Sequence, residues 1–134
     1  MEKIAVTLLA VGVLLATGAA PRGPEVYFVG LKDGSILPLH AKIKFGIRGM
    51  KLRPAGEDPE DKGSGHHHLI IDGGPIPEGT LVPADEKHIH FGKAQTETEV
   101  DLATGFHVLT LQLADGAHRS YGPRLAQSIQ IIAR

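Results

Sequence analysis

The chain has 134 residues, with 14 basic and 15 acidic side chains, eight histidines and no cysteine. This length fits a single domain, and a net charge of −1 gives no reason to expect nucleic acid or a charged membrane surface as the partner. The lack of cysteine removes thiolate from any metal site, so that histidine, carboxylate and methionine are the ligands that remain.

Residues 1–20 show the three parts of a secretory signal peptide. Lys3 provides the positive start, residues 4–16 form an apolar run, and residues 17–20 are small, as signal peptidase requires. We expect cleavage after Ala19 and a single domain over residues 21–134. The alternative is an uncleaved anchor, but the apolar run is shorter than the ~20 residues that span a bilayer. The sequence therefore predicts a periplasmic or secreted protein with no membrane span after cleavage.

The rest of the chain alternates between short β-prone runs and turns rich in glycine and proline. Residues 26–29 form the first run, and residues 39–47 alternate apolar and polar side chains with the period of a half-buried strand. Residues 50–65 are rich in glycine, proline and charge and predict a long exposed loop. Residues 66–72 predict another strand, whereas prolines exclude a regular central strand over residues 73–84.

Further strands are predicted near the C-terminus, at residues 87–91, 96–102, 106–113 and 128–133. About seven short strands separated by regular turns are typical of an all-β fold, and we expect an immunoglobulin-like antiparallel β-sandwich. The start of the 106–113 run also resembles the entry to a late strand of immunoglobulin-like domains, which bears on the fold and not on the function.

Two histidine clusters carry the functional argument. Residues i and i+2 of a strand share a face, so His66 and His68 face one way while His67 points toward the core. His88 and His90 share a face of the later strand in the same way. If the two strands are neighbours, their opposed Cβ atoms lie about 4.5–5.5 Å apart. Four imidazoles could then converge on one ion, and a site without sulfur ligands favours copper or zinc.

The other histidines are less informative. His118 follows the Asp-Gly turn at residue 115 and either reaches the site, as the next candidate ligand, or caps that turn. His67 and His107 are interpreted as structural rather than as ligands, and His40 alternates with lysines on a solvated face. A hydrogen-bonded cluster of histidines without metal is the main alternative to a metal site.

Catalysis has little support in the sequence, which carries no nucleophile elbow, phosphate-binding loop or His-Glu-x-x-His motif. Asp72 or Glu97 could serve as a base or as a partner of a metal-bound histidine. We therefore expect a transition-metal-binding protein that is not an enzyme. One alternative is an envelope recognition module whose histidine face and 50–65 loop contact a protein or polymer without metal. A weaker one is a metal-dependent enzyme with an open coordination position.

Three segments carry a family resemblance: residues 65–72 (GHHHLIID), 88–97 (HIHFGKAQTE) and 109–123 (LTLQLADGAHRSYGP). In this order they resemble a family of exported bacterial proteins, the domain-of-unknown-function family numbered 4399. The resemblance covers the chain from about Pro24 to the C-terminus. It implies an export signal and a compact β domain, and it implies no established activity. Ala94 stands where members of the family often carry glycine, which bears on the tightness of that turn and not on the histidines.

Overall fold

The structure is a computed structural model that describes residue 12, residue 18 and residues 22–134. The predicted signal peptide over residues 1–20 lies almost entirely outside these residues. The described chain contains nine strands, one short 3-10 helix (η1, Pro123–Leu125) and no α-helix, which confirms the all-β prediction. Within the described part of the chain, no helix is long and apolar enough to cross a membrane.

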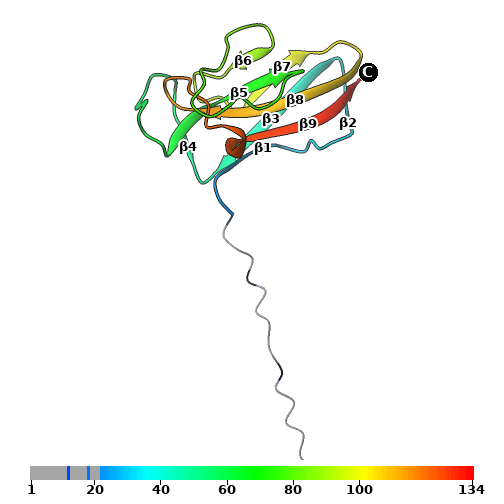
Figure 1. Cartoon of the computed structure of the whole chain (residues 1–134). Coiled ribbons are helices and arrows are strands. Elements are labelled where there is room, and N and C mark those ends of the chain that lie inside the picture. The colour runs from blue at the N-terminus through cyan, green and yellow to red at the C-terminus, as the bar shows by residue number, and fades with distance from the viewer. Residues whose placement is uncertain (1–11, 13–17, 19–21) are drawn as a thin grey trace, which may run out of the picture.

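The strands form two sheets that pack on each other as a sandwich (Figure 1). The smaller sheet is antiparallel, in the order β1 (Glu25–Phe28), β3 (His40–Arg48) and β7 (Glu97–Asp101). The larger sheet has the order β2-β9-β8-β5-β4, and β6 also pairs with β5. Its strands are β2 (Ser35–Leu37), β4 (Lys51–Leu52), β5 (Ser64–Ile71), β6 (His88–His90), β8 (Gly105–Ala114) and β9 (Ala126–Ala133).

Two short strands depart from the purely antiparallel expectation. β2 pairs with β9, and β4 pairs with β5, and both of these pairs are parallel. The sequence analysis missed both strands because three and two residues are too short to show a period of two. β4 falls inside the segment 50–65 that was predicted to be a loop, so the loop proper begins after Leu52.

The core lies between the two sheets and follows the alternation in the sequence. Ile43 and Phe45 of β3 are buried, and they belong to one apolar cluster with Leu69 of β5 and Leu111 of β8. His67 points into the same core, where its ring centroid lies 4.9 Å from that of Phe45. The side chain of His67 has no exposed surface, which confirms the prediction that it is a core residue.

The outer face of the larger sheet is also covered near β5, because the segment after β5 folds back over it. The Thr110 hydroxyl donates to the Gly73 carbonyl at 2.6 Å, and the Ile76 N–H donates to Oε1 of the buried Gln112 at 3.0 Å. The Ser120 hydroxyl in turn donates to the Ile76 carbonyl at 2.8 Å. As a result, β5 is buried on both of its faces.

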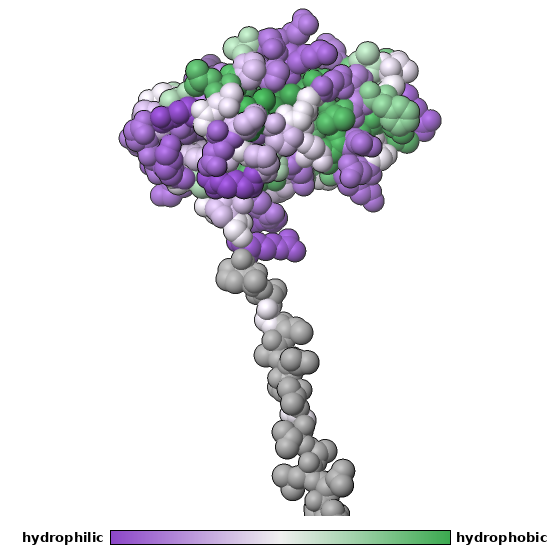
Figure 2. All heavy atoms as spheres, viewed as in Figure 1, coloured by the Kyte–Doolittle hydropathy of each residue, from purple (hydrophilic) through white to green (hydrophobic). Residues whose placement is uncertain are grey.

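Exposed hydrophobic side chains are found at the opposite end of this sheet. Ile36 of β2 and Phe106 of β8 are both exposed, and both lie in register with Ile132 of β9. Figure 2 shows a largely hydrophilic surface on which hydrophobic residues gather toward the end where β2 and β9 lie in Figure 1. Phe106 is the second residue of β8, whereas Ala114, the last residue of β8, lies opposite His66, so the hydrophobic end is remote from the histidine triplet.

Candidate metal centre

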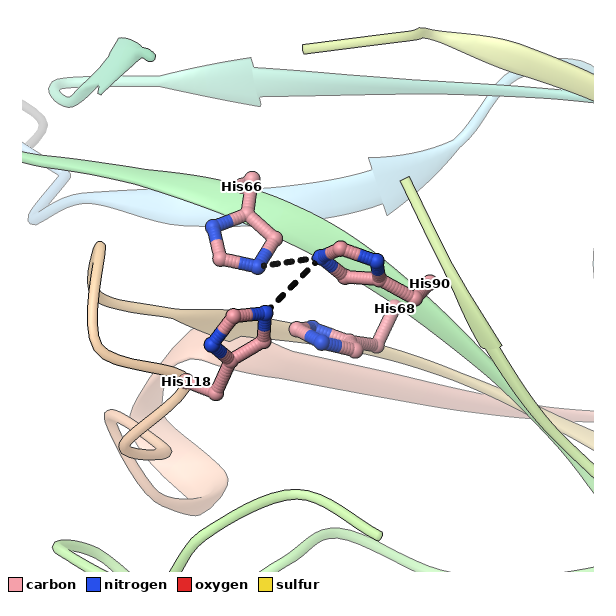
Figure 3. Close-up of side chains that lie close together, drawn as sticks. All are labelled: His66, His68, His90 and His118. Carbon is pink, nitrogen blue, oxygen red and sulfur yellow. Dashed lines mark hydrogen bonds between the residues drawn. The ribbon is translucent and has the colours of Figure 1, made fainter. Parts of the chain in front are cut away.

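Four histidines converge on the outer side of β5, namely His66, His68, His90 and His118 (Figure 3). Each offers one ring nitrogen, and these four nitrogens all lie within 4.8 Å of one another. The Nε2 atom of His90 lies 3.1 Å from Nε2 of His66 and 3.0 Å from Nε2 of His118. We call this group the four-histidine cluster.

Strand pairing explains how residues that are distant in sequence meet here. His66 and His68 share the outer face of β5, and His68 lies directly opposite His90 of β6. On the other side of β5, His66 lies opposite Ala114, the last residue of β8. The chain then turns back, and His118 reaches the cluster from this turn. Three separate segments thus supply the four side chains.

Two glycines leave room for close packing around the rings of His66 and His90. A Cβ atom on Gly65 would lie 2.3 Å from the Ala114 carbonyl oxygen, so the absence of a side chain there lets β5 and β8 approach each other beside His66. A Cβ atom on Gly92 would lie 2.3 Å from Cε1 of His90, so that the ring of His90 occupies the space that a side chain at residue 92 would need.

The four-histidine cluster is closed toward the protein and open toward solvent. His66 and His68 expose 0% and 2% of their surface, whereas His90 is exposed. Burial, and then the neighbouring rings of His118 and His90, lower the pKa of His66 to about 4. Burial and the other ring nitrogens lower the pKa of His68 to about 3, and burial and His118 lower that of His90. These three imidazoles are therefore neutral near pH 7, which is the form that binds metal.

The arrangement could hold a metal ion, and hydrogen bonds alone leave some of its ring nitrogens without partners among the described residues. Four nitrogens at 2.0–2.1 Å from a tetrahedral zinc ion lie about 3.4 Å from one another, and the ring nitrogens of the cluster lie between 3.0 Å and 4.8 Å apart. Without an ion, Nε2 of His90 faces two ring nitrogens but carries at most one proton. Nδ1 of His66 and Nδ1 of His68 are buried without a hydrogen-bond partner among the described residues.

A comparison with known protein families adds one result. The family model described as a domain of unknown function, DUF4399, matches residues 43–134. The chain belongs to this family. The matched segment contains all four members of the four-histidine cluster, so the cluster is part of the DUF4399 domain itself. A search of curated proteins found no match.

The structure does not bring His88 into the cluster of this DUF4399 domain, although the sequence analysis named it as a ligand. His88 lies opposite Ile70 and shares the face of His90, but its Nδ1 atom lies 2.7 Å from Oδ1 of Asp85. The same oxygen accepts the N–H groups of Lys87 at 2.9 Å and of His88 at 3.0 Å. The turn before β6 therefore holds the His88 ring away from the four converging nitrogens.

The remaining histidines lie where the sequence analysis expected. His40 is exposed and lies 2.6 Å from Asp101, whereas His107 lies 3.0 Å from Asp72 and 2.7 Å from the Ala103 carbonyl. Asp72 thus partners a structural histidine and not the four-histidine cluster. Glu97, the other candidate partner, lies 3.6 Å from Lys42.

Two residues that shape this DUF4399 site were not singled out in the sequence. Gly92 was read as part of a motif, although a glycine two residues after a candidate ligand can signal that a ring occupies the adjacent space. Asp115 was recognised only as part of a turn dipeptide. Its buried carboxylate is in fact the centre of a hydrogen-bond network beside His118.

Proposed function

We propose that this DUF4399 domain binds one copper or zinc ion through the four-histidine cluster and serves to bind, buffer or deliver that metal outside the cytoplasm. The observation that carries the proposal is the convergence of four ring nitrogens within 4.8 Å of one another, with no carboxylate among the described residues joining them. Neutral imidazoles of this kind suit zinc and copper, and no thiolate is present to draw softer ions.

The site favours exchangeable binding over catalysis. Four protein ligands fill a tetrahedral zinc shell, whereas catalytic zinc sites keep one position for water or substrate. Histidines at high-affinity sites usually donate their second ring N–H to a carboxylate or a carbonyl, and such partners raise affinity by 10- to 100-fold. Nδ1 of His66 and of His68 have no such partner among the described residues, and the exposed His90 leaves the cluster open to solvent. These features support reversible binding of the ion.

The location is part of the same proposal and rests on residues 1–20. A chain exported through its signal peptide would meet copper or zinc outside the cytoplasm. We expect the mature protein to begin at Ala20, which intact-mass measurement of the exported protein would show. A full-length mass in the membrane fraction would instead mean that the N-terminus is a retained anchor.

Stoichiometric metal uptake tests the proposed function. The mature protein, prepared without an affinity tag, should take up one Zn(II) or Cu(II) ion per chain in a saturable titration, with elemental analysis of the dialysed sample as the readout. His68→Ala should abolish tight uptake, and His40→Ala, which changes an exposed histidine outside the cluster, should leave it intact. If neither metal binds in a saturable way, the proposal fails and an envelope recognition module becomes the better explanation.

A further inference from the structure

The turn that carries His118 has an unusual backbone. Residues 115–119 connect the end of β8 to Ser120, which pairs back with Ala114. His118 lies in the left-handed region with a φ of 64°, a conformation that is strained for a residue with a side chain. Its Nε2 atom nevertheless lies 3.0 Å from Nε2 of His90. Something in the turn must therefore stabilise this conformation.

The carboxylate of Asp115 supplies that support from inside the turn. Asp115 is only 1% exposed, and its Oδ1 atom accepts the N–H groups of Ala117 at 2.9 Å and Arg119 at 3.0 Å. Its Oδ2 atom accepts from Nε of Arg119 at 2.7 Å and from Nζ of Lys62 at 3.4 Å. The Asp115 carbonyl also accepts the N–H of His118 at 2.9 Å. These bonds close the loop on both sides of His118.

The segment 53–63 holds the same turn from outside. The Gly56 N–H donates to the Gly116 carbonyl at 2.9 Å, and Nη2 of Arg119 donates to the Pro59 carbonyl at 3.1 Å and to Glu60 at 2.8 Å. A Cβ atom on Gly116 would lie 2.7 Å from the Glu57 carbonyl oxygen, so the two segments are in direct contact. Arg119 thus joins Asp115 to this segment.

We propose that Asp115 is the positioning residue for the metal site: it acts through His118 and does not touch the ion. The inference rests on the proposed function and deepens it. Asp115 contributes no atom to the four-histidine cluster, and its carboxylate oxygens are already occupied by donors from its own turn and from Lys62. What it provides is a His118 ring that is already in place when the ion arrives, so that metal binding does not have to order the turn.

The proposal predicts that Asp115 and His118 behave as one unit. Loss of an outer partner of a ligand typically lowers metal affinity by 10- to 100-fold. We therefore expect Asp115→Ala to weaken Zn(II) binding by this factor, and His118→Ala to weaken it by at least as much. The double variant should bind Zn(II) no more weakly than His118→Ala, because Asp115 has no role once His118 is gone.

The experiment is a competition titration of Zn(II) against a chromophoric chelator, with the mature wild type, the two single variants and the double variant. Co(II) absorption spectra of the same proteins provide a second readout, which a loss of stability alone would not change. Asp115→Asn keeps an oxygen at Oδ1 and should recover part of the affinity. If Asp115→Ala does not fold, the same four-protein cycle with Asp115→Asn takes its place.

The outcomes separate the two proposals. If the wild type binds neither Zn(II) nor Cu(II), the proposed function fails, and the role of Asp115 fails with it; if it binds Cu(II) alone, the same four proteins are compared with Cu(II). If wild type binds and His118→Ala weakens binding, but Asp115→Ala binds like wild type, only the positioning role is overturned. It is also overturned if the losses of the two single variants add in full in the double variant, because the two residues would then act independently.

Discussion

The four-histidine cluster differs from the other outward-facing histidines in its neighbours and not in its residue type. Three histidines outside the cluster each lie beside a carboxylate, and these pairs are His40 with Asp101, His88 with Asp85 and His107 with Asp72. Inside the cluster the rings face one another, and burial lowers the pKa of His66, His68 and His90. The candidate site is thus defined by rings that contact one another and no carboxylate, more than by the number of histidines.

Substitution of histidines in the four-histidine cluster should have the largest effect. Zn(II) should raise the melting temperature of the wild type at pH 7.5, because binding at a hundredfold excess over Kd stabilises by about 2.7 kcal/mol, which is several degrees for a domain of this size. His68→Ala and His90→Ala should each remove most of this shift, and their combination should remove little more, since both act on one site.

The matched controls come from the carboxylate-paired group. His88→Ala and His107→Ala should keep the full Zn(II)-dependent shift, even if the metal-free protein is less stable. Differential scanning fluorimetry with and without Zn(II) separates the two effects. Loss of the shift in His88→Ala would return His88 to the set of ligands, and equal shifts in all variants would mean that the ion binds elsewhere.

The next largest effect on Zn(II) binding should come from a substitution that crowds the ring of His90. Gly92→Ala places a methyl group 2.3 Å from Cε1 of His90, which is too close for van der Waals contact, so the ring must move away. We expect Zn(II) affinity to fall by about tenfold or more, as for other changes that misplace a ligand. Gly74→Ala is the control, because nothing lies within 4 Å of the added Cβ. Unchanged affinity in Gly92→Ala would show that His90 is dispensable.

We expect a smaller, pH-dependent effect on stability from substitution of His107, one of the three histidines paired with a carboxylate. The Ala103 carbonyl and then Asp72 raise the pKa of His107 above its ordinary value of 6.5. The charged form is therefore favoured in the folded protein. Its stabilisation is fully present below pH 6.5 and is lost as pH rises through the raised pKa. His107→Gln should thus cost about 1 kcal/mol at pH 5.5 and clearly less at pH 8.5, as measured by urea denaturation. Equal losses at both pH values would contradict an ionic role.

The smallest expected effect concerns the turn after β6. Ala94 has a φ of 59°, the left-handed region in which glycine is favoured. Ala94→Gly should therefore stabilise the protein by up to about 1 kcal/mol, after the greater flexibility of glycine in the unfolded chain is subtracted. Ala103→Gly, at an alanine without positive φ, should destabilise it slightly. If both variants lose stability to the same extent in denaturant titrations, the turn is not strained.

Local patterns in the sequence predicted which way side chains face. The period of two in residues 66–72 was enough to place His67 in the core and His66 and His68 on the other side. The interaction of His88 with Asp85 could also have been predicted from the sequence. Asp85 lies only three residues before His88, and this spacing favours a turn closed by the carboxylate.

The assembly of the site could not be predicted in the same way. That His90 lies opposite His68 depends on the register between β5 and β6, and the 16 residues 72–87, which form no named strand, come between those two strands. His118 joins them from a left-handed turn that is held by Asp115, by the segment 53–63 and by Val82, whose N–H donates to the His118 carbonyl at 2.9 Å. No local signal predicts contacts between segments so far apart in the chain. The two parallel edge strands were not predicted because, at three and two residues, they are too short to show a period of two, and their pairing is set by tertiary packing.

A last consequence follows from β7, which lies at the edge of the smaller sheet among the described strands. Its exposed residues Glu97, Glu99 and Asp101 face the partners Lys44, Lys42 and His40 on β3. An open strand edge is a place where a second copy can add its own backbone and begin a fibre. Two such edges would bring like charges together, which disfavours edge-to-edge pairing of two copies. Self-association is thus resisted by a row of residues that has no part in the histidine chemistry.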